Sequence, residues 1–162
     1  MKRLLLGVVP TLLLVPAAAA AQVNLGAHIG WGDEADFAFG ARLTANSPWV
    51  DPAIEFSGSF DYFFPEKPPS TEDVEYWEVN LNAVYRIPID HPSLSPYAGA
   101  GVNIARSTID SASQTDVGAN LLAGVKYVAG PVVPFGELRV ELGGGDQFVL
   151  AGGLLFNLWA GN

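Results

Sequence analysis

Nine charged residues recur at positions that an extended chain would turn to one side. Glu137, Arg139 and Glu141, for example, stand two residues apart, and alternate residues of a strand project from the same face. On the inner face of a closed sheet, such groups would either form salt bridges or line a path for ions. This lumen charge set comprises four basic and five acidic residues: Arg42, Glu55, Asp61, Glu78, Arg86, Lys126, Glu137, Arg139 and Glu141.

The near balance of charge favours a salt-bridge network over an ion path. The interior of a small barrel is about wide enough for side chains alone, and an unpaired charge there would be costly. We therefore interpret the set as a plug that fills the lumen. A gate or a conducting path through the same residues is the alternative.

The strands that would carry these residues show alternating polarity. In residues 75–87, EYWEVNLNAVYRI, every second residue from Trp77 to Ile87 is apolar and those between are mostly polar. A tilted strand of about 9–11 residues crosses a bilayer. The same alternation recurs in eight segments: 23–31, 37–44, 54–62, 75–87, 95–105, 117–127, 135–142 and 147–159. The pattern predicts an all-β fold, an eight-stranded antiparallel up-and-down transmembrane β-barrel.

Composition agrees with a wall that faces lipid. The chain is 49% hydrophobic and only 15% charged, yet no stretch of the mature chain is apolar for long enough to form a spanning helix. Lys2 and Arg3, the apolar run 4–15 and the small residues 17–21 predict a signal peptide over residues 1–21, with the barrel domain over 22–162. The absence of cysteine excludes disulfides, thiolate metal sites and a lipoprotein anchor.

Connections between the segments alternate in kind. Compact turns at 45–52, 88–93 and 129–131 contrast with the acidic or longer connections 32–36, 64–73, 107–114 and 143–146. Longer loops face the exterior in outer-membrane barrels, so we place the acidic connections outside. The longest of them is a candidate surface-interaction loop, with Glu66, Lys67, Glu72 and Asp73 as its charged residues.

Aromatic residues near the segment ends argue against a soluble barrel that binds an apolar ligand inside. We expect one aromatic girdle at each membrane interface, the outer one including Trp31, Phe37, Phe63, Phe64 and Trp77. The polar face is also rich in Gly, Asn and Ser, where a soluble exterior would carry Lys and Glu.

No catalytic group or cofactor motif emerges. His28 falls on the polar face and His91 in a compact turn, so we expect His28 to be a hydrogen-bonding lumen residue and no catalytic triad. The acidic rim residues Asp33, Glu34, Asp36 and Asp146 could hold Ca²⁺, but solvated loop charge is the simpler interpretation. We predict no enzyme, no cofactor and no metal site.

Three stretches resemble a known superfamily. SPYAGAGVNIA (95–105), GVKYVAG (124–130) and PFGELRVEL (134–142) are similar to the small outer-membrane β-barrels, which include the OmpA transmembrane domain, OmpX and the opacity-type surface proteins. Such barrels commonly end on an aromatic residue that the barrel assembly machinery recognises. Here Ala160, Gly161 and Asn162 follow Trp159, which departs from that pattern.

The resemblance and the residues together imply an integral protein of a bacterial outer membrane. We expect a structural or surface-interaction role, in envelope integrity or adhesion, through the connections 64–73 and 107–114. A narrow pore for small solutes or ions is the first alternative and a lipid-modifying enzyme the second. The partners expected are the bilayer, lipopolysaccharide, the barrel assembly machinery and an extracellular ligand. Eight Lys and Arg against 17 Asp and Glu argue against nucleic acid.

Overall fold

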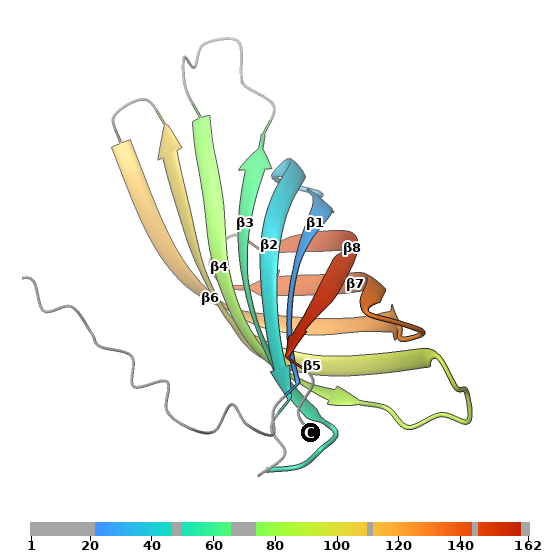
Figure 1. Cartoon of the computed structure of the whole chain (residues 1–162). Coiled ribbons are helices and arrows are strands. Elements are labelled where there is room, and N and C mark those ends of the chain that lie inside the picture. The colour runs from blue at the N-terminus through green and yellow to red at the C-terminus, as the bar shows by residue number, and fades with distance from the viewer. Residues whose placement is uncertain (1–21, 47–49, 66–73, 110–111, 144–145, 160–162) are drawn as a thin grey trace, which may run out of the picture.

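The chain folds into one closed barrel of antiparallel strands (Figure 1). The computed structural model describes residues 22–46, 50–65, 74–109, 112–143 and 146–159. The strands are β1 (Val23–Gly32), β2 (Asp36–Asn46), β3 (Ile54–Phe64), β4 (Val74–Arg86), β5 (Leu94–Ile109), β6 (Ala112–Tyr127), β7 (Val132–Leu142) and β8 (Gln147–Trp159). Each strand pairs with its sequence neighbours, and β1 pairs with β8 to close the sheet. The predicted eight-stranded up-and-down barrel is confirmed.

Alternation along each strand separates an apolar outside from a polar inside. In β4, Leu81 and Tyr85 are exposed, whereas Glu78, Asn80 and Asn82 are buried. The same parity holds in β8, where Leu154 and Phe156 point outward. A one-residue slip in register would reverse these faces, so the hydrophobic pattern fixes the pairing.

The hairpin of β5 and β6 is longer than its alternation predicts. Ser107 pairs with Gln114 and Ile109 with Ala112, so most of 107–114 is strand and its prediction as a loop is wrong. Because β7 ends at Leu142, which pairs with Ala119, the outer part of β6 pairs with β5 only. Figure 1 shows this hairpin (yellow to gold) projecting beyond the turn that joins β1 and β2.

The interior is closed by small apolar clusters near both ends of the barrel. At the end that carries the β1–β2, β3–β4, β5–β6 and β7–β8 connections, here called the outer end, Phe63 packs with Ala35, Ala38 and Val149. Phe63 is 1% exposed, so its placement in the aromatic girdle is wrong: it is an interior residue. Two more clusters lie towards the opposite, inner end: Val84, Tyr97 and Leu122, and Val133, Phe135 and Leu155.

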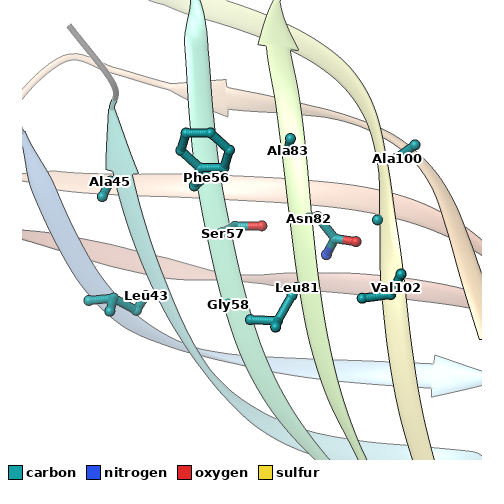
Figure 2. A pocket seen from close by; sticks show the side chains of 11 residues that line it. Leu43, Ala45, Phe56, Ser57, Gly58, Leu81, Asn82, Ala83, Ala100 and Val102 are labelled. Carbon is teal, nitrogen blue, oxygen red and sulfur yellow. The ribbon is translucent and has the colours of Figure 1, made fainter. Parts of the chain in front are cut away.

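The outer wall is a largely apolar surface with shallow hollows. Aromatic rings gather near the outer end, with ring centroids 5.0 Å apart for Phe37 and Phe39 and 5.2 Å apart for Tyr62 and Phe64. Lower on the wall, Gly58 leaves a hollow of about 500 Å³ between the outward side chains of Phe56 and Leu81 (Figure 2). Among the described residues, no helix is long and apolar enough to cross a membrane.

Candidate functional site

Arg139 on β7, one of the largest buried side chains among the described residues, organises the polar lumen. Its Nε atom donates to Glu141 Oε1 at 2.6 Å, and its Nη2 atom lies 3.2 Å from Asp61 Oδ2 and 3.4 Å from Glu78 Oε2. All four side chains are at most 3% exposed. One guanidinium is therefore shared by three buried carboxylates that come from β3, β4 and β7.

A histidine on β1 also contacts this cluster. His28 Nε2 lies 2.5 Å from Asp61 Oδ1, and Ser59 donates to the other oxygen of Asp61 at 3.1 Å. The contact crosses β2 at Gly40, where a Cβ atom, if one were present, would lie 2.2 Å from His28 Nε2 and 2.3 Å from Asp61 Oδ1. Glycine at position 40 is thus required for His28 and Asp61 to meet, and the expectation that His28 is a hydrogen-bonding lumen residue is met.

The next ion pair towards the inner end is bidentate. Arg42 donates from Nη1 to Glu137 Oε2 at 2.7 Å and from Nη2 to Glu137 Oε1 at 2.6 Å. Tyr97 donates to the same carboxylate at 2.9 Å, and the Arg42 guanidinium lies 4.5 Å from the centroid of the Phe135 ring. Gly124 lies between Tyr97 and Glu137 in the register and leaves room for the tyrosine hydroxyl. Such fork-shaped pairs are strong, because both hydrogen bonds join charged groups.

Of the remaining members of the lumen charge set, two pair with each other and one does not join the set. Lys126 on β6 donates to Glu55 on β3, and both side chains are buried. Arg86, at the end of β4, instead donates to the main-chain carbonyl of Pro52 in the β2–β3 connection. Within the described residues Arg86 has no ion pair with the others, so its place in the predicted network is not supported by the geometry.

Neutral side chains complete the lumen, and the charged residues alone do not reveal them. Asn120 donates to Asn80 at 2.8 Å and to Asn82 at 2.9 Å, while Asn80 donates to Asp61 at 2.8 Å. Gln147 donates to Glu78 at 2.7 Å and to Glu141 at 2.8 Å. The alternation that assigns the charged residues to the inside would also have found these amides.

The remaining sequence-based candidates lie near or beyond the rim. The candidate surface-interaction residues Glu66, Lys67, Glu72 and Asp73 fall outside the described residues. The acidic rim residues Asp33, Glu34, Asp36 and Asp146 do not converge on a metal site: no group of three or more side chains that could hold a metal ion occurs in the described part of the chain. Asp33 and Asp146 instead accept main-chain N–H bonds from Phe148 and Gly143.

A closed barrel with an apolar outer wall and a polar, ion-paired lumen is typical of membrane-spanning β-barrels. The chain belongs to the outer membrane protein beta-barrel domain family, whose model matches residues 8–143. The predicted resemblance to small outer-membrane barrels is therefore confirmed. A search of curated protein sequences finds no match.

Solved structures share this fold at low sequence identity. The N-terminal barrel domain of OprF from Pseudomonas aeruginosa is 20% identical, with a TM-score of 0.67, and the match covers 85% of this chain and 97% of that one. Neisserial surface protein A gives the same identity and coverage with a TM-score of 0.63. Ail, the attachment invasion locus protein of Yersinia pestis, is 16% identical over 85% of this chain and 95% of that one, with a TM-score of 0.59. Ail has also been solved with the heparin analogue sucrose octasulfate, in a structure that is 17% identical, with a TM-score of 0.53 and coverage of 85% and 96%.

Proposed function

We propose that this protein is an integral outer-membrane barrel with a plugged lumen, and that its role is structural or in interactions at the cell surface. The observation that carries the proposal is the set of ion pairs that joins opposite walls. Arg42 on β2 binds Glu137 on β7, and Arg139 on β7 reaches Asp61 on β3 and Glu78 on β4. Side chains linked across the interior in this way leave little free cross-section for solutes.

The outer end is the part available to an extracellular partner. Its described carboxylates include Asp33, Glu34 and Asp146, and its described basic residue is Arg106 on β5. A surface of this charge suits a cationic partner and disfavours a polyanion such as a sulfated sugar. We therefore do not extend to this chain the heparin-analogue binding seen in the Ail complex.

The proposal also includes export by the signal peptide over 1–21, assembly by the barrel assembly machinery and contact with lipopolysaccharide. The family and the lipid-facing wall support them, since a barrel of this kind reaches its membrane by that route. No catalytic role is proposed, because the buried His28–Asp61 pair is enclosed by the lumen residues and, within the described part of the chain, opens onto no substrate cavity.

Recording of ion current tests the plug. Purified, refolded protein in a planar lipid bilayer should give no resolved current steps, whereas well-defined, ion-selective steps from the unaltered protein would overturn the proposal. Arg42→Ala serves as the informative variant, because it removes the bidentate pair that links β2 to β7 across the lumen. The matched control is Arg106→Ala on the outward face of β5.

A narrow pore is the second candidate, and one observation favours it. Several buried polar atoms of the lumen have no protein partner among the described residues, including His28 Nδ1, Asn103 Oδ1 and Arg139 Nη1. Buried polar atoms without protein partners are commonly satisfied by water. A hydrated chain through the lumen would pass small ions, and the same recording distinguishes this candidate from the plug.

A further inference from the structure

One basic residue of the lumen charge set takes no part in the ion pairs of the lumen. Arg86 lines a cavity of about 430 Å³ at the inner end, formed by the β2–β3 connection, the end of β4 and the start of β5. Its Nη2 atom donates to the main-chain carbonyl of Pro52, which anchors the guanidinium. This neutral acceptor does not balance the charge, and Arg86 has no ion pair among the described residues. The cavity therefore contains a cation that an anionic ligand could pair with.

Apolar side chains surround the cavity, where a turn in water would carry polar ones. Ile87, Ile89 and Leu94, which line the cavity, are 44%, 47% and 39% exposed. Next to them on β4, Tyr85 points outward and is 49% exposed. Exposed apolar groups that continue a lipid-facing wall indicate contact with the bilayer, and tyrosine is enriched at the bilayer interface. Arg86 thus lies at the depth of the lipid headgroups, where a basic side chain can reach a phosphate.

The same wall leads from the cavity to the hollow at Gly58. Ala83, Tyr85 and Ile87 are outward residues in succession; Ala83 lines the hollow (Figure 2), whereas Ile87 lines the cavity. The four residues from Ala83 to Ile87 span about 13 Å of extended chain. Half of the hydrocarbon core of a bilayer is about 15 Å thick. A lipid whose headgroup occupies the cavity can therefore place an acyl chain in the hollow.

A carboxylate in the cavity selects among headgroups. Asp51 Oδ1 accepts a hydrogen bond from the main-chain N–H of Ala53 at 2.7 Å, which holds the carboxylate on the β2–β3 connection. Asp51 and Arg86 both line the cavity, yet within the described part of the chain they form no ion pair with each other. Opposite charges held apart in one cavity match a headgroup that carries both a phosphate and an ammonium. A headgroup whose only charge is a phosphate would bring a second anion beside Asp51.

We propose that the inner end binds a glycerophospholipid whose headgroup joins a phosphate to a primary ammonium. Arg86 donates to the phosphate, which gives charge-assisted hydrogen bonds. Asp51 accepts from the ammonium, and one acyl chain lies in the hollow at Gly58. A trimethylated ammonium has no N–H to donate, so a choline headgroup fits less well. The inference rests on the integral barrel of the proposed function, but not on whether its lumen conducts.

Native mass spectrometry of the purified, refolded protein in neutral-detergent micelles tests the proposal. Phosphatidylethanolamine, phosphatidylcholine and phosphatidylglycerol with identical acyl chains are the probes, and each is titrated separately. The expected result is saturable binding of one phosphatidylethanolamine molecule, tighter than binding of the other two lipids. Equal binding of the three lipids, as expected of a wall that lipid covers without a site, would overturn the proposal.

Two variants test the charges that bind the headgroup. Arg86→Gln should weaken binding of phosphatidylethanolamine about tenfold, in the range for loss of a hydrogen bond to a charged group. Asp51→Asn keeps an oxygen for the N–H of Ala53 and should abolish the preference over phosphatidylglycerol. Arg106→Gln, at the outer end, is the control for Arg86→Gln and should leave the affinity unchanged. Wild-type affinity in Arg86→Gln, or an unchanged preference in Asp51→Asn, would contradict the assignment.

A third variant tests the hollow by filling it. Gly58→Leu should weaken binding severalfold, whereas Gly136→Leu, on the lipid-facing wall of β7 with open space around it, should not. Equal affinities of these two variants would contradict the placement of the acyl chain. A change of mobility in SDS on boiling shows that a variant has folded, so loss of the lipid site is distinguished from loss of the barrel. Absence of that change in the unaltered protein would count against the barrel itself.

Discussion

Replacement of Arg139 by methionine removes the one guanidinium that three carboxylates share. Arg139 is 1% exposed, and Glu141, Asp61 and Glu78 are all buried beside it. Methionine has nearly the length of the arginine side chain but no charge, so the carboxylates would be left to repel one another. Loss of one partner of a buried ion pair typically costs about 3–5 kcal/mol. We expect a loss of that size in the free energy of unfolding.

Unfolding by guanidinium chloride from lipid vesicles, followed by tryptophan fluorescence, measures this loss, since the chain contains four tryptophans. Arg106→Met is the control, an exposed arginine on β5 whose replacement should change the free energy by about 0.5 kcal/mol or less. The double variant Arg139→Met with Glu141→Gln should recover part of the loss, because it removes one of the repelling carboxylates. A loss equal to that of Arg106→Met would refute a lumen held together by buried ion pairs.

Three further predictions concern other parts of the barrel. Gly40→Ala should destabilise the protein by about 1–3 kcal/mol, because its Cβ would separate His28 from Asp61, whereas Gly136→Ala, with open space around it, should be nearly neutral in the same unfolding assay. Gly58→Arg places a charge on the lipid-facing wall and should cost about 2–4 kcal/mol, while Gly58→Leu fills the hollow and should not. The chain has no native cysteine, so a maleimide would label only a cysteine that is introduced. Ser70→Cys should react with an impermeant maleimide on intact cells, and Ser93→Cys should react only after lysis. The reverse pattern would contradict the predicted orientation.

Alternating polarity was sufficient to predict the barrel and the inward set of charges, because lipid on one side and a packed lumen on the other impose opposite demands on successive residues. The pattern failed where that contrast ends. Residues 107–109 and 112–114 form strand but lie beyond the main barrel wall, where both faces of the hairpin are largely exposed. With no lipid against either face, alternation of polar and apolar residues is not required, and the sequence there predicts a loop.

Parity alone also does not predict where along a strand a residue lies or which residue it pairs with across the lumen. Arg86 has the parity of an inward residue, but it stands at the last position of β4 and binds a turn carbonyl. Phe63 likewise has the inward parity of Glu55 and Asp61, a signal that its aromatic type and position near a strand end obscured. The pairing of Arg42 with Glu137, 95 residues apart, depends on the closure of the barrel and cannot be read from spacing.

The most direct test of an integral outer-membrane barrel is electrophoresis of the membrane fraction in SDS, with and without boiling. A closed barrel whose strands are hydrogen-bonded to one another all around the wall resists SDS until it is heated. We predict that the protein is found in the outer-membrane fraction and that its unboiled form migrates differently from its boiled form. A protein recovered from the soluble periplasmic fraction, with a single mobility under both conditions, would contradict an integral outer-membrane barrel.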